Sequence, residues 1–188
     1  MMIRGGIQVE RWVVGSAKGS FADMFTDADM LRLQREQYRH DQRNHTDILH
    51  LSKNDRLKHY GLHFAKYVGR LARGSSEPIS YERTIVDTVL VSLSAANTLY
   101  QHLVSPAPLG KDARQIDPLR TYADAAGRFA DACEKIDHLE EFIPIARRAN
   151  ADVMSWALQQ AEERKLDLQE KLRQRRGELR GRQFYIAD

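Results

Sequence analysis

The stretch TIVDTVLVSLSAANTLYQHLV, residues 84–104, decides the fold of this 188-residue chain. Apart from His102, the only side chain in it that is charged near neutral pH is Asp87. Hydrophobic residues recur along the stretch at helical spacing, which predicts a helix with a wide apolar face at the centre of a bundle. Its Ser, Thr, Asn and Gln side chains make it too polar for a lipid-facing span, so we expect no membrane association.

Helical patterns continue on both sides of this central helix. We expect helices at residues 27–45, 52–73, 80–104, 118–136 and 144–176. Candidate N-cap residues precede four of them: Asp27 or Asp29, Ser52, Ser80 and Asp117. Residues 105–118 hold three prolines and a glycine, which predicts the longest internal loop.

The two ends of the chain differ from this helical middle. Residues 3–14, IRGGIQVERWVV, are the one β-like passage and predict an extended arm. The last helix becomes increasingly polar after Gln159, so we expect its distal half to project into solvent or to lie against a second subunit. The predicted fold is all-α, a bundle of about five helices with an N-terminal extended arm and a long C-terminal helix. The predicted parts are an arm at 1–20, a helical core domain at 21–160 and a charged helix or tail at 161–188.

Composition is typical of a folded intracellular protein. Hydrophobic residues make up 42% and charged residues 29%, with few Gly or Pro, which argues against disorder. The single cysteine, Cys133, cannot form an internal disulfide, and its apolar neighbours predict a buried thiol rather than a nucleophile. No unbroken apolar stretch follows the first residues, so no secretory signal is visible and we expect a cytoplasmic protein.

Arginines crowd the end of the chain, although the formal net charge is only +3. They are Arg173, Arg175, Arg176, Arg180 and Arg182. No interleaved aromatic residues or known nucleic-acid module accompany them, so we expect a solvated helix end. Contact with nucleic acid or an acidic partner is the alternative.

Asp87 is the best pointer to a functional site. A carboxylate in an uncharged helix is costly to bury unless it is paired, metal-bound or protonated. At helical spacing Ser94 and Thr98 share a polar stripe with Asp87, with Gln101 nearby, and such a stripe resembles one wall of a cleft. The alternative is a structural ion pair or hydroxyl network that joins two helices.

The preceding helix supplies candidate partners for Asp87. His59, His63, Lys66 and Arg70 recur at four, three and four residues and therefore line one face. Two histidines one turn apart, His59 and His63, would bind a divalent metal together with Asp87. Lys66 and Arg70 would instead make a cationic wall for phosphates. An ordinary solvated face is the third interpretation.

Other catalytic motifs are incomplete or absent in the sequence. His40-Asp41 resembles the adjacent pair of HD-type phosphohydrolases, but no histidine precedes His40. There is no P-loop, no dinucleotide-binding glycine pattern and no Cys/His zinc spacing. We therefore assign no catalytic residue from these motifs.

Two segments, LHFAKYVGRLA (62–72) and TIVDTVLVSLSAANTL (84–99), resemble the central helical pair of the MazG-like all-α nucleoside triphosphate pyrophosphohydrolases. Asp87 stands where that family has its last metal-binding acid. Asn97, ten residues later, stands where the family has a characteristic asparagine. The resemblance covers about a quarter of the chain. It implies a nucleotide- or phosphate-related cleft between the helices 52–73 and 80–104, where Lys66, Arg70 and Asn97 contact the ligand.

The other acids of the family motif are missing here. His63 and Lys66 stand where the first acidic pair belongs, and Thr84 replaces the first acid of the second pair. Mg²⁺ prefers oxygen ligands, so we expect a degenerate relative that binds without hydrolysis; an active protein would be a nucleoside triphosphate pyrophosphohydrolase. We also expect a homodimer. The rival hypothesis is a structural or protein-interaction module in which Asp87 only pairs with Lys66.

Overall fold

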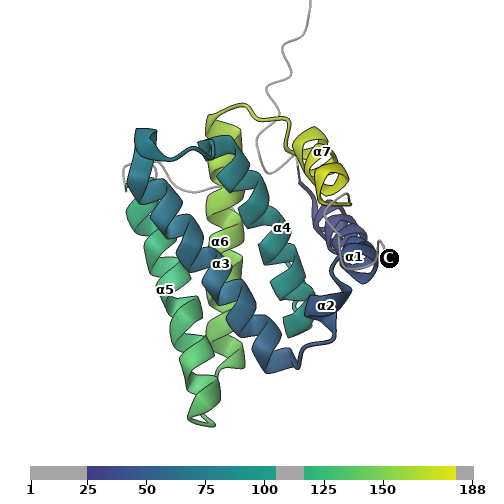
Figure 1. Ribbon diagram of the computed structural model, residues 1–188, viewed down its shortest axis with the longest axis vertical. Coiled ribbons are helices and arrows are strands. Elements are labelled where there is room, and N and C mark those ends of the chain that lie inside the picture. The colour runs from purple at the N-terminus through teal and green to yellow at the C-terminus, as the bar shows by residue number, and fades with distance from the viewer. Residues whose placement is uncertain (1–24, 105–116, 181–188) are drawn as a thin grey trace, which may run out of the picture.

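The computed structural model describes residues 25–104 and 117–180, and these ranges are helical without any strand (Figure 1). The helices are α1 (Asp27–Asn44), α2 (Thr46–Leu49), α3 (Lys53–Arg73), α4 (Tyr81–Leu99), α5 (Pro118–Asp137), α6 (Ile143–Glu163) and α7 (Leu168–Arg180), with a 3₁₀ turn at Gly74–Ser76. The all-α prediction is confirmed, with seven helices across the described ranges in place of about five. The predicted arm at 1–20 and most of the predicted loop lie outside these ranges.

Local capping chemistry explains where most helices begin. The hydroxyls of Ser52 and Ser80 accept hydrogen bonds from main-chain N–H groups three residues on, and the Asp117 carboxylate caps α5, whose first residue is Pro118. At α1 the N-cap is Thr26, with Asp29 completing a capping box. The predicted cap, Asp27 or Asp29, was therefore one to three residues late.

Helices α3, α4, α5 and α6 form a four-helix bundle, and α1 and α7 lie against the other side of α4 (Figure 1). Aromatic pairs fill the bundle core. The rings of Phe64 and Phe129 meet edge to face at 5.0 Å between α3 and α5, and those of Tyr122 and Trp156 lie 4.5 Å apart between α5 and α6. Cys133 is partly buried between α5 and α3, and burial raises the pKa of its thiol to about 11.

Helix α4 is the central element because both layers pack on it. Most of its 19 residues are buried, including Thr84, Asp87, Thr88, Ser92 and Ser94. It ends at Leu99, where Tyr100 takes a left-handed conformation with φ of 49°, so the helix stops five residues before the predicted end at 104. Within the described ranges, no helix is both long and apolar enough to span a membrane.

The prediction of one long C-terminal helix is wrong, because the chain turns between α6 and α7. Lys165 has φ of 53°, and Asp167 caps the next helix by accepting a hydrogen bond from the Glu170 N–H at 3.0 Å. Helix α7 then packs on α1 and α4 with Leu168 and Leu172 buried. The distal half therefore folds back onto its own chain, and residues 168–180 belong to the core rather than to a separate charged tail.

Candidate functional site

A cavity of about 270 Å³ lies between α3 and α4, and α1, α2 and α7 complete its wall. We call it the α3/α4 cavity. Helix α3 contributes His59, Tyr60, His63, Lys66, Tyr67 and Arg70; α4 contributes Asp87, Leu90, Val91 and Ser94; the other lining residues are Gln37, Asp41, His45, Ile48, Leu49, Arg175 and Leu179. The structure thus brings together five of the six predicted site residues around one space.

Asp87 is buried and bound by three arginines. Arg175 of α7 approaches Oδ1 at 2.7 Å through Nε, Arg83 of α4 approaches the same oxygen at 3.2 Å, and Arg70 of α3 approaches Oδ2 at 3.2 Å. These charge-assisted hydrogen bonds offset the free-energy cost of removing the Asp87 carboxylate from water. The predicted partner, Lys66, is not among the three.

Sequence reasoning missed two of these arginines for different reasons. Arg83 lies four residues before Asp87, so its position one helical turn away was a usable signal. Arg175 is 88 residues away, and nothing in the local pattern separates it from its solvated neighbours. It is nonetheless buried, so the expectation of a solvated helix end is wrong for Arg175, although Arg173 and Arg180 are exposed as expected.

Positive charge exceeds negative charge at this end of the cavity. Four cations, Lys66, Arg70, Arg83 and Arg175, gather around two acids, since Glu178 pairs with Arg83 and Arg175 at 3.0 Å each. The pKa of Lys66 is lowered, first by partial burial and then by the charges of Arg70 and Arg175. A cation that is destabilised by other cations marks a place where an anion would be favoured.

Burial lowers the pKa of both His59 and His63. Their Nε2 atoms lie 3.2 Å apart, and Nδ1 of His63 lies 3.2 Å from the Tyr67 hydroxyl and 3.0 Å from Lys66 Nζ. Burial, with the added charge of Lys66, lowers the pKa of His63 to about 3. Both ring nitrogens of His63 are thus engaged by neighbouring side chains, and a neutral pair would add no charge to the cavity.

The predicted metal ligands His59, His63 and Asp87 do not form a metal site. No group of three or more His, Cys, Asp or Glu side chains in the described part of the chain is arranged to hold an ion. Both oxygens of Asp87 are bound by guanidinium groups, and the two histidine rings contact each other. The divalent metal that the resemblance implies does not fit these residues, because Mg²⁺ takes several oxygen ligands and this wall is cationic.

Asn97 does not reach the α3/α4 cavity. Its Nδ2 donates to the main-chain oxygen of Gln34 at 3.0 Å, so the residue ties α4 to α1. Ten residues at 100° each place Asn97 about 80° around the helix from Asp87, which explains why the two side chains face different neighbours. Of the predicted polar stripe, Ser94 lines the cavity with Asp87, whereas Gln101 binds Arg147 and Asn150 elsewhere.

Asp41 lies in the same cavity, although the sequence drew attention to it only beside His40. Its side chain accepts hydrogen bonds from the Ser94 hydroxyl at 2.6 Å and from the Gln37 amide at 2.8 Å. Burial raises the pKa of Asp41 to about 6. His40 instead lines a different hollow, so the two residues do not act as an HD pair.

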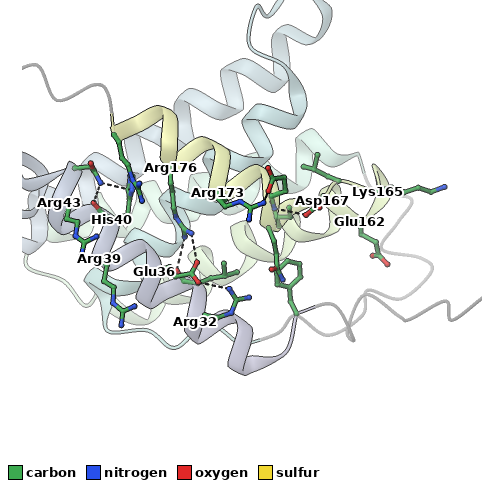
Figure 2. A pocket seen from close by; sticks show the side chains of 18 residues that line it. Arg32, Glu36, Arg39, His40, Arg43, Glu162, Lys165, Asp167, Arg173 and Arg176 are labelled. Carbon is green, nitrogen blue, oxygen red and sulfur yellow. Dashed lines mark hydrogen bonds and ion pairs between the residues drawn. The ribbon is translucent and has the colours of Figure 1, made fainter.

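That second hollow, the α1/α7 groove, is larger and more open, with a volume of about 1170 Å³ (Figure 2). Its basic lining residues are Arg32, Arg39, Arg43, Lys165, Arg173, Arg176 and Arg180. Arg176 reaches across it to Glu36 at 3.0 Å (Figure 2). The same arginine donates to the Gln37 side-chain oxygen at 3.0 Å. This arginine, too, is partly buried and structural rather than solvated, while Arg182 lies outside the described residues.

Comparison with known protein families, with curated proteins and with solved structures found no match to this chain. The resemblance to MazG-like pyrophosphohydrolases therefore stays a prediction from the sequence.

Proposed function

We propose that the α3/α4 cavity binds a small phosphate-bearing ligand, and that this ligand is a nucleotide. The observation that carries the proposal is the excess of cations around Asp87. Lys66 and Arg70 both line the cavity, and Arg70 uses only Nη1 in its hydrogen bond to Asp87. A guanidinium has five N–H donors, so several remain to bind phosphate oxygens.

The remaining walls suit the uncharged part of such a ligand. Leu90, Val91, Ile48 and Leu49 supply apolar surface, and the rings of His59 and Tyr67 lie beside it. Ligand sites combine mostly apolar walls with a few convergent polar groups, in volumes of roughly 300–1,000 Å³. At about 270 Å³ the cavity lies just below this range, which favours a mononucleotide over a triphosphate.

Hydrolysis by the family's metal mechanism is not part of the proposal. That mechanism needs carboxylates free to hold Mg²⁺ beside the phosphates. Asp87, the one acid retained from the motif, is occupied by arginines instead. The protein is therefore proposed to bind a nucleotide without releasing pyrophosphate, with Lys66, Arg70 and Arg175 in place of the cation's charge.

A structural or protein-interaction module is the second candidate, and one observation favours it. The bonds of Asp87 join α3, α4 and α7, which is what a purely structural ion cluster would do. Under this hypothesis the cations serve only the fold, and no phosphate compound binds.

A thermal-shift panel separates the two candidates. The ligands are inorganic phosphate, pyrophosphate and nucleoside mono-, di- and triphosphates, each with EDTA and with Mg²⁺, Mn²⁺ or Zn²⁺, and pyrophosphate release is measured in parallel. We expect the melting temperature to rise with nucleotide concentration in EDTA, by mass action, without pyrophosphate release. If no phosphate compound changes the melting temperature, nucleotide binding is rejected and the structural or protein-interaction module remains. Release of pyrophosphate would contradict the proposal that the protein binds without hydrolysis.

The homodimer is retained as a separate proposal. Large apolar side chains are exposed on the described surface, among them Tyr100, Val104 and Leu139. Sedimentation equilibrium of the full chain tests it directly, because a dimer has twice the mass of the 21.6 kDa monomer. A single species at the monomer mass across the concentration range would contradict it.

A further inference from the structure

The end of the α3/α4 cavity opposite the cations is built around one buried carboxylate. Asp41 is 4% exposed, and no Lys, Arg or His in the described part of the chain forms an ion pair with it. Gln37 donates to Oδ1 and Ser94 donates to Oδ2. Each oxygen keeps further acceptor capacity, because an ionised carboxylate has about four lone-pair sites.

The two donors hold this carboxylate in a fixed orientation. Arg176 donates to the side-chain oxygen of Gln37 at 3.0 Å, which turns the Gln37 amide nitrogen toward Asp41. Ser94 holds the other oxygen from α4 at 2.6 Å. A buried acceptor that is oriented before a ligand arrives loses little entropy on binding, so it is suited to recognition.

The carboxylate and the cations lie at opposite ends of the cavity. Ser94 follows Asp87 by seven residues on α4, which places it two helical turns, or about 10 Å, further along the helix. Leu90 and Val91 line the cavity between them. A ligand that spans this space therefore has an anionic group at one end, an apolar middle and a hydrogen-bond donor at the other end.

We propose that Asp41 recognises a guanine-type base, whose edge presents two adjacent N–H donors, one from the ring and one from the exocyclic amine. This inference rests on the proposed nucleotide function and names the base. Adenine and cytosine present a ring nitrogen acceptor beside their amine, which a carboxylate repels. Uracil presents one donor between two acceptors. Only the guanine edge fits both oxygens of Asp41.

Calorimetric titration of the full chain with GMP, IMP, AMP and CMP at pH 8 tests the base preference without any substitution. IMP is the sharpest comparison, because it keeps the ring N–H of GMP and lacks the amine. We expect GMP to bind roughly tenfold to a hundredfold more tightly than AMP or CMP, with IMP between them. Equal affinity for the four nucleotides would overturn the inference and leave phosphate binding intact.

Asp41→Asn tests the residue itself, with Asp47→Asn on the exposed surface of α2 as the matched control. An asparagine turns one acceptor into a donor, so Asp41→Asn is expected to lose the preference for GMP over AMP. Pyrophosphate binding, which uses only the cationic end, should be retained and so reports that the cavity is folded. A preserved GMP preference in Asp41→Asn would overturn the inference. Absence of binding by pyrophosphate and every nucleotide to the wild-type protein would instead reject the proposed function on which it rests.

Discussion

Asp87 illustrates how a single residue can be significant for a reason other than the expected one. Its position on an uncharged helix indicated correctly that it needs a partner, and the structure supplies three from α3, α4 and α7. The carboxylate balances arginines that would otherwise repel one another at close range. It therefore orients the cationic wall of the cavity, and both of its oxygens are bound by guanidinium groups.

Replacing Asp87 by Asn should strongly destabilise the fold. Arg70, Arg83 and Arg175 would remain close together with only Glu178 to offset them, and breaking a buried ion cluster costs about 3 kcal/mol or more. Urea unfolding measures the loss. Glu82→Gln, at an exposed position of the same helix, is the control and should cost well under 1 kcal/mol. Equally small losses in both variants would contradict a stabilising role for the ion cluster around Asp87.

Asp41 should make the folded state less stable as pH rises from about 4 to about 6, which is the opposite of the usual effect of an ion-paired carboxylate. Its pKa is raised from 3.8 to about 6, so between these values the folded state binds more protons than the unfolded state. The free energy of unfolding contributed by this group therefore falls as pH rises from about 4 to about 6. Asp41→Asn removes this fall, on the order of 2–3 kcal/mol.

The comparison must be made between variant and wild type, because histidines act in the opposite direction. Burial lowers the pKa values of His40 and His63, so their contribution to the free energy of unfolding rises with pH over the same range. These contributions cancel in the difference between the two proteins. Stability curves that stay parallel from pH 4 to pH 6 would contradict the assignment to Asp41.

At the scale of elements, starts of helices were predictable and their interruptions were not. Ser52, Ser80 and Asp117 were identified because capping depends on residues within one turn. The break between α6 and α7 has neither Gly nor Pro, since it reads Arg164-Lys165-Leu166-Asp167. The available signal was Asp167 followed by Glu170, a helix-start pattern inside an apparently continuous helix.

The turn before α7 should be improved by glycine. Lys165 has φ of 53°, is exposed, and occupies a left-handed conformation that costs a residue with a side chain about 1 kcal/mol. Lys165→Gly is therefore expected to raise stability by up to about 1 kcal/mol, measured by urea unfolding. Lys171→Gly, inside α7, should lower it by about as much. If both variants changed the free energy of unfolding in the same direction, Lys165 would not have the left-handed conformation described above.

Helix α7 should be part of the cooperative core. Leu172 is 1% exposed, so Leu172→Ala is expected to cost about 2–4 kcal/mol through lost contacts and a cavity. Leu62→Ala on α3 makes the same chemical change at a side chain that is 72% exposed and should cost below about 0.5 kcal/mol. A small effect at Leu172, with α7 rapidly exchanging its amide protons, would indicate a helix that detaches from the bundle.

For the whole molecule, the sequence predicted one wall of the candidate site and missed the others. His59, His63, Lys66 and Arg70 share a face because α3 is regular, and helical periodicity is readable from sequence. Arg175 and Asp41 come from α7 and α1, which meet the cavity only after long-range packing. Asn97 was misplaced for the same reason, since its partner Gln34 is on a helix that the local pattern cannot locate.

Helices α1 and α7 both pack on α4 (Figure 1). Their residues Gln37, Asp41, Arg175 and Leu179 complete the lining of the α3/α4 cavity. If these two helices detached from α4, Asp87 would lose its bond to Arg175 and Asp41 would lose its bond to Ser94. The bundle of α3 to α6 supplies the rigid support, and the outer helices supply one charged group at each end of the ligand space. Binding and stability should therefore be coupled through α7.

The central claim is that the cationic wall binds phosphate, and one paired measurement tests it most directly. GMP is titrated calorimetrically, in EDTA, into wild type, Lys66→Gln and Lys58→Gln. Lys58 is the matched control because it is also on α3 but pairs with Asp137 of α5, away from the cavity. We expect roughly tenfold weaker binding for Lys66→Gln and unchanged binding for Lys58→Gln. Equal affinity of all three proteins for GMP, or no binding by wild type, would contradict it.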